Sequence, residues 1–237
     1  MTDIGEKLFA GSSEMALIAA AHELKAPLAL IRQLALGLES EAASVQSTRL
    51  AHKIALSSER ALRLTSDLTR ASRLQAGLFE LEPINPIELC EDIARELKPL
   101  FDARGVNIRV RRSRNALLAV ANRDLLRRVV ANFSDNALEY VGDNNIVELA
   151  ASGGRNGIRI GVRDYGPAVS PKILKGLRSS LGRTVQPLQA RPSSSGLGLY
   201  LAGRFAEHMS GKIGTVNHRD GTTFYIDLPA SRQLSLL

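Results

Sequence analysis

Residues 124–140 read DLLRRVVANFSDNALEY, a helical pattern with an unusual polar side. Polar side chains recur every four residues, at Asp124, Arg128, Asn132, Asn136 and Tyr140, so they share one face of a helix. The opposite side is apolar and predicts packing against a core, with Leu125, Val129, Phe133, Ala137 and Val141. Asparagine is a poor helix former, but its carbonyl oxygen suits a Mg²⁺ ion that carries phosphates. The plain alternative is a surface helix with incidental asparagines.

The segments on both sides of this helix alternate between strand and helix patterns. We expect helices over 87–104 and 199–209, and strands over 106–110, 117–121, 146–151, 158–162, 213–216 and 223–228. Hairpin signals, Asn156-Gly157 and Asp220-Gly221, separate two pairs of neighbouring strands. Because strands and helices mix without regular βαβ units, the pattern predicts an α+β two-layer sandwich over residues 87–237.

Two loops in this region carry glycines beside polar groups. Asp164 follows a strand, and its carboxylate can accept a hydrogen bond from an exocyclic amine such as that of adenine; Gly166 lets the backbone approach a planar ring. Gly196 and Gly198 open a helix and free backbone N–H groups to cradle phosphate. Each loop taken alone also fits an ordinary turn. The lysine signature of a P-loop is absent.

The first third of the chain predicts two long helices, over 13–40 and about 48–75. In the first helix, apolar residues alternate at spacings of four and three, which is a heptad seam: Leu17, Ala21, Leu24, Leu28, Ile31, Ala35 and Leu38. The short polar link over 40–47 predicts an antiparallel α hairpin. Since one hairpin leaves its seam half exposed, we expect two copies to close a four-helix bundle in a homodimer.

The first of these helices contains the segment AHELKAPL, residues 21–28. The imidazole of His22 is a workable phosphoryl acceptor, and Glu23 can polarise the ring or accept its proton. Pro27 removes a backbone donor and loosens the helix one turn later. The simple alternative is a solvated histidine. His52, on the second helix, has no such neighbours.

The composition limits the class of protein. The chain has 237 residues, 44% of them hydrophobic, and a formal net charge of +7, a weak pointer to anionic partners. Its single cysteine, Cys90, excludes an internal disulfide and fits a reducing compartment. No apolar run approaches the roughly 20 residues of a membrane span. We therefore expect a cytoplasmic protein with no membrane segment. We also expect no nucleic-acid partner, although the positive charge alone would allow one.

In combination, these motifs resemble two domains of sensor histidine kinases. Four motifs resemble, in order, the N, G1, G2 and G3 boxes of the GHKL (Bergerat) ATP-binding fold. They are Asn132 with Asn136, Asp164 with Gly166, Gly196 with Gly198, and the segment 221–224. That resemblance covers roughly 82–229. The segment HELKAPL resembles the H box of the dimerisation and phosphotransfer (HisKA) domain. Gyrase B, MutL and Hsp90, which share the ATP-binding fold, have no such histidine hairpin.

The resemblance implies ATP and Mg²⁺ as cofactors. Asn136, with Asn132 nearby, would hold the metal, Asp164 would bind the adenine amine, and residues 168–195 would form a mobile lid. The full set of implied ATP-binding residues is Asn132, Asn136, Tyr140, Asp164, Gly166, Gly196, Leu197, Gly198, Leu199 and Thr223. The implied organisation is an N-terminal segment over 1–12, a dimerisation and phosphotransfer domain over 13–76, a linker over 77–86 and an ATP-binding catalytic domain over 87–237.

The implied activity is that of a histidine protein kinase in a two-component system. ATP would phosphorylate His22, and the phosphoryl group would pass to an aspartate on a response-regulator receiver domain. One alternative is a catalytically degenerate dimeric scaffold that binds nucleotide weakly. Another is a GHKL ATPase that acts on DNA or client proteins.

Several residues depart from the family pattern. Glu139 stands where the family commonly has a basic residue, and a carboxylate that pointed inward there would repel phosphate. Ala26 replaces the usual Thr or Asn four residues after the histidine, so we expect weak phosphatase activity. Ala168 replaces a second glycine of the G1 box, and the lid lacks a Phe-rich box.

Overall fold

The computed structural model describes residues 24–25, 28–38, 44–74, 79–111, 118–142, 144–154, 157–167 and 197–231. Its internal contacts divide the chain into two units, Met1–Leu78 and Phe79–Leu237. Within the described ranges, no helix combines the length and the apolar composition that a membrane crossing requires.

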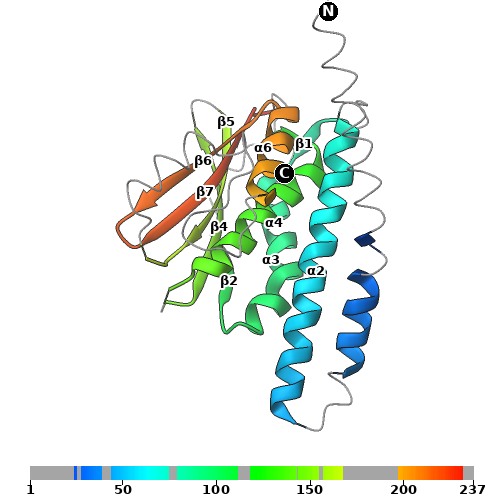
Figure 1. Ribbon diagram of the computed structural model, residues 1–237. Coiled ribbons are helices and arrows are strands. Elements are labelled where there is room, and N and C mark those ends of the chain that lie inside the picture. The colour runs from blue at the N-terminus through cyan, green and yellow to red at the C-terminus, as the bar shows by residue number, and fades with distance from the viewer. Residues whose placement is uncertain are drawn as a thin grey trace, which may run out of the picture. The chain divides into compact units, whose positions relative to one another are not determined.

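The first unit consists of a helical segment over 28–38 and helix α2, Val45–Arg73, which run antiparallel (Figure 1). Ser44 caps α2, because its side chain accepts a hydrogen bond of 3.1 Å from the backbone N–H of Ser47. Arg32 and Glu59 join the two helices through an ion pair of 2.6 Å. The hairpin expected for this part of the chain therefore forms where the structure describes it.

Large apolar side chains of this unit remain exposed. They occur on both helices: Leu24, Leu30, Ile31, Leu34, Leu36, Leu38, Val45, Leu50 and Ile54. An open groove of about 370 Å³ lies between the helices and is lined by Leu28, Ile31, Leu50, Ile54, Ser57 and Ser58. Most of the heptad seam on the described part of the first helix is thus not covered within one chain.

The second unit is built on a five-stranded mixed sheet in the order β2-β4-β5-β7-β6. Its strands are β2 (Asn107–Arg111), β4 (Ile146–Gly154), β5 (Gly157–Asp164), β6 (Lys212–His218) and β7 (Gly221–Leu228). Strands β2 and β4 pair in parallel, and the other three pairs are antiparallel. Because β7 lies between β5 and β6, the start of β7 is placed beside the end of β5.

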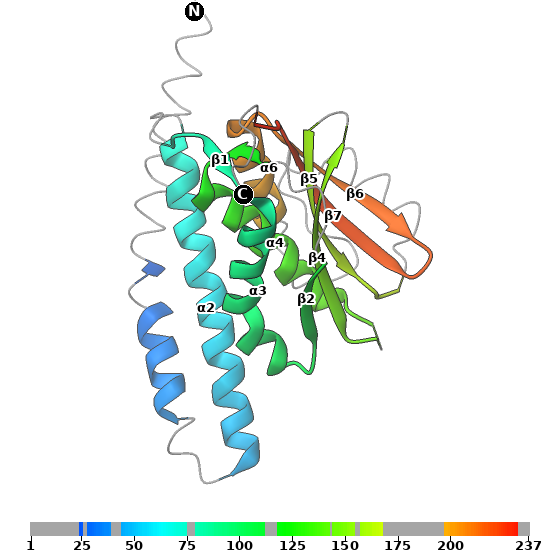
Figure 2. The same ribbon diagram turned by 180° about the vertical axis from the view of Figure 1, so that it is seen from behind.

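Three helices cover one face of this sheet (Figures 1 and 2): α3 (Pro86–Asp102), α4 (Arg123–Tyr140) and α6 (Leu197–His208). The core between the layers contains the fully buried Phe101, Phe133, Phe205, Leu125 and Leu149. The rings of Phe133 on α4 and Phe224 on β7 lie 5.9 Å apart. The two-layer α+β sandwich expected from the sequence is confirmed.

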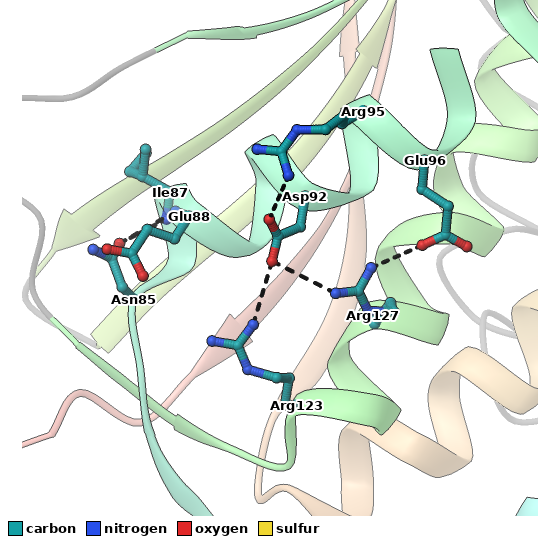
Figure 3. Close-up of polar contacts among 8 residues, drawn as sticks. All are labelled: Asn85, Ile87, Glu88, Asp92, Arg95, Glu96, Arg123 and Arg127. Atoms are coloured by element: carbon teal, nitrogen blue, oxygen red, sulfur yellow. Dashed lines mark hydrogen bonds and ion pairs between the residues drawn. The ribbon is translucent and has the colours of Figure 1, made fainter. Parts of the chain in front are cut away.

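The second unit starts earlier than the sequence predicted. Strand β1, Glu82–Ile84, pairs antiparallel with β3, Ala119–Ala121. Asn85 then caps α3, accepting a hydrogen bond of 3.1 Å from the backbone N–H of Ile87 (Figure 3). The expected linker over 77–86 is therefore largely folded into the second unit, since its prolines occupy a strand and a helix start.

A charge cluster holds α3 against α4 (Figure 3). The carboxylate of Asp92 faces three guanidinium groups, at 3.3 Å from Arg95, 3.4 Å from Arg123 and 3.6 Å from Arg127. Arg127 also donates a hydrogen bond of 2.8 Å to Glu96. One carboxylate thus offsets much of the repulsion between guanidinium groups on two neighbouring helices.

We expect Asp92→Asn to destabilise the second unit by about 1 kcal/mol, because one exposed and two partly buried guanidinium groups lose a shared counter-charge. Urea unfolding of the full chain measures the effect. Asp102→Asn, which breaks only the exposed pair with Lys98, should change stability by less than about 0.5 kcal/mol. High salt should shrink the Asp92 effect; equal losses in the two variants would contradict the cluster's role.

Candidate nucleotide site

Asp164 ends strand β5 and is almost fully buried, with 2% of its surface exposed. Its Oδ1 atom accepts hydrogen bonds from the backbone N–H groups of Gly166, at 3.0 Å, and Thr222, at 3.3 Å. The first donor is local, whereas the second arrives because β7 pairs with β5. Both donors reach Oδ1, which leaves Oδ2 as the oxygen that can receive an N–H group from a ligand.

Burial raises the pKa of the Asp164 carboxyl above its ordinary value, because the charged form loses its hydration. The backbone N–H groups of Gly166 and Thr222 and the nearby guanidinium of Arg163 lower that pKa without cancelling the effect of burial. A buried carboxylate that has lost its hydration is stabilised by any hydrogen-bond donor that a ligand supplies in place of water. An exocyclic amine is such a donor.

Two glycines bring three backbone segments together around this carboxylate. A Cβ atom on Gly166 would lie 1.8 Å from the carbonyl oxygen of Tyr140, at the end of α4. A Cβ atom on Gly221 would lie 2.1 Å from the carbonyl oxygen of Asp164, and its φ of 134° disfavours other residues. The sequence suggested that the missing side chain of Gly166 lets the backbone approach a planar ring. In the structure, it lets the backbone approach the carbonyl group of Tyr140.

The polar stripe of α4 lies beside the start of α6. Asn132, Asn136 and Tyr140 are all half-buried. The side-chain amide of Asn132 donates a hydrogen bond of 3.2 Å to the carbonyl oxygen of Gly198, in the first turn of α6. Leu199 is buried and anchors that turn in the core, while Leu197, the first residue of α6, is half-buried. The asparagine helix and Gly198 are therefore neighbours.

The two threonines of β7 face opposite sides of the sheet. Thr223 shares a hydrogen bond of 2.8 Å with Nε2 of His218, on the face away from the helices. Thr222 is buried on the helix-covered face, like Phe224. The structure brings the backbone N–H of Thr222 to Asp164, whereas the expected ATP-binding role of Thr223 stays a prediction. The alternation of strand residues could have indicated that the Thr222 side chain is buried, because Thr222 is separated by even numbers of residues from the apolar Phe224, Ile226 and Leu228 of β7.

The remaining predicted residues lie outside the described ranges. They are His22, Glu23, Gly196 and the lid segment over 168–195, together with Ala26. Their expected roles stay predictions.

The described side chains fit a nucleotide. The hydroxyl oxygen of Thr222 is buried and has no hydrogen-bond partner among the described residues, although buried polar groups are normally paired. The backbone N–H of the same residue bonds Oδ1 of Asp164 at 3.3 Å, so this hydroxyl belongs to the surroundings of the carboxylate. Asn136 adds a hard amide oxygen of the kind that Mg²⁺ accepts.

Comparison with known proteins agrees with this geometry. Residues 121–232 match the family described as histidine kinase-, DNA gyrase B- and HSP90-like ATPase. The sensor protein GacS of Pseudomonas syringae is 26% identical over 90% of the chain, and the sensory kinase SasA of Prochlorococcus marinus is 26% identical over 92%. Full-length ShkA, solved in complex with AMPPNP, is 25% identical over 94% of the chain, with a TM-score of 0.66.

The second unit therefore contains a domain that is similar to the GHKL-type ATPases, and the relatives named above are sensor proteins and sensory kinases. The chain spans only part of these proteins: 24% of GacS, 57% of SasA and 47% of the ShkA chain.

Proposed function

We propose that this chain is the kinase core of a two-component sensor. It uses ATP to phosphorylate His22 and passes the phosphoryl group to an aspartate of a response-regulator receiver domain in the cytoplasm. The observation that supports this most directly is the buried carboxylate of Asp164, which lies beside Thr222 and near the end of α4. The H-box resemblance around His22 supports the choice of a kinase over a simple ATPase.

In this proposal Asp164, Thr222 and the two asparagines of α4 bind the nucleotide and orient it. Asp164 receives the adenine amine, and Thr222 adds a second polar contact. Asn132 and Asn136 face the phosphates, where Mg²⁺ would supply charge neutralisation and ATP the γ-phosphoryl group. Glu23 holds or accepts the imidazole proton, so that one ring nitrogen of His22 is free to act as nucleophile. Positioning and charge neutralisation then supply most of the catalysis.

We also propose that the chain works as a homodimer. The exposed apolar residues of the first unit, and the groove lined by Leu28, Ile31, Leu50 and Ile54, are the surface that a second hairpin would cover. Two hairpins would then form a four-helix bundle with a continuous apolar core.

Labelling with [γ-³²P]ATP and Mg²⁺ tests the kinase proposal. The native chain should acquire an acid-labile, base-stable label. His22→Gln should remove essentially all of it, and His52→Gln, the matched change on the second helix, should retain it. Label that persists in His22→Gln would refute the assignment of the acceptor. Absence of label in the native chain, together with weak ATP binding, would favour the degenerate scaffold.

A further inference from the structure

Glu139 lies on the face of α4 that carries the asparagines. A helix turns by about 100° per residue, so Glu139 projects within about 20° of Asn132 and about 60° of Asn136. It immediately precedes Tyr140, whose carbonyl oxygen adjoins Gly166. The side chain of Glu139 is 26% exposed. Glu139 therefore shares the face of Asn132 and is one residue from the carbonyl group that adjoins Gly166, next to Asp164.

A cation from another element lies beside this carboxylate. Arg104 belongs to the turn that follows α3, where its backbone N–H bonds the carbonyl oxygen of Phe101 at 3.0 Å. Its Nη2 atom lies 3.7 Å from Oε1 of Glu139. Helices α3 and α4 run side by side in the same direction, since Asp92 faces Arg123 and Arg127 near the start of α4 and Arg104 meets Glu139 near its end.

We infer that Arg104 is a positioning residue for the nucleotide phosphates and acts through Glu139. A triphosphate laid along α4 carries several negative charges, and the carboxylate of Glu139 would repel it. The guanidinium of Arg104 offsets that charge and pulls the carboxylate toward the α3–β2 turn. The inference rests on the proposed nucleotide site. It predicts that the affinity for ATP depends on Arg104 through the phosphates, whereas the affinity for adenosine does not.

Calorimetric titration of the full chain with Mg²⁺-ATP and, separately, with adenosine tests the inference. Arg104→Ala should weaken Mg²⁺-ATP binding about tenfold and leave adenosine affinity unchanged. Glu139→Gln should not weaken ATP binding. In the double variant, ATP affinity should return to the value of Glu139→Gln alone, because the carboxylate that Arg104 compensates is gone.

Lys98→Ala is the matched control, because it removes the same charge from a surface ion pair within α3. Its ATP affinity should equal that of the native chain. Three results overturn the inference alone: native ATP affinity in Arg104→Ala, equal losses for ATP and adenosine, or an Arg104 effect that persists in the Glu139→Gln background. A native chain that binds neither ligand would overturn the proposed function and the inference together.

Discussion

Asp164→Asn is expected to weaken ATP binding by at least about 100-fold. The substitution keeps an oxygen for the backbone N–H groups of Gly166 and Thr222. It replaces the second carboxylate oxygen by an NH₂ group. Because this NH₂ group and the adenine amine are both hydrogen-bond donors, the hydrogen bond between the residue and adenine is lost. A lost charge-assisted hydrogen bond and an unpaired buried group together account for this magnitude. Asp220→Asn, at the exposed β6–β7 turn, should bind ATP with native affinity.

The same variant should not lose stability, and this separates binding from folding. Because burial raises the pKa of Asp164, the folded chain holds a proton on this carboxyl more tightly than the unfolded chain. The contribution of Asp164 to stability is therefore fully present below its unfolded pKa and is lost as the pH rises through the folded pKa. Asp164→Asn avoids that loss.

We expect the melting temperature of Asp164→Asn at pH 7 to equal or exceed that of the native chain. Its advantage should shrink as the pH falls toward the ordinary range of a carboxyl group. Thermal unfolding at several pH values measures both effects. A variant that melts well below the native chain at pH 7 would mean that the ionised carboxylate is structurally required.

Gly166→Ala is expected to destabilise the second unit by about 3 kcal/mol or more. The new methyl group would lie 1.8 Å from the Tyr140 carbonyl oxygen and 3.2 Å from Oδ1 of Asp164. The nearer obstacle is backbone and cannot rotate away, so the end of α4 must separate from the end of β5. Overpacking against a flexible side chain usually costs less. ATP affinity should fall with stability.

Tyrosine fluorescence during urea unfolding isolates this effect, because all four tyrosines of the chain lie in the second unit. Gly105→Ala serves as the control. Gly105 has a φ of 67° with open space around its Cβ position, so alanine there should cost about 1 kcal/mol through backbone conformation alone. Losses of the same size at both glycines would show that the segments around Gly166 can move apart freely.

The α4 region shows which features of the candidate site could be predicted from the sequence and which could not. The spacing of Asn132 and Asn136 predicted a helix with a functional stripe, and the structure places Asn132 of that stripe against the first turn of α6. The sequence also raised the possibility that Glu139 repels phosphate. Only the packed structure shows a cation beside it, because Arg104 is distant in sequence and its approach depends on how α3 lies along α4.

The sequence by itself determined the local elements of this protein: the helices, the hairpins and the polar face of α4. These follow from periodicities and turn preferences that act over a few residues. Tertiary structure decided the parallel pairing of β2 with β4, the position of β7 between β5 and β6, and the meeting of Thr222 with Asp164. The physical reason is that pairing between distant segments depends on the packing free energy of the whole sheet and its helices, which no short stretch of sequence contains.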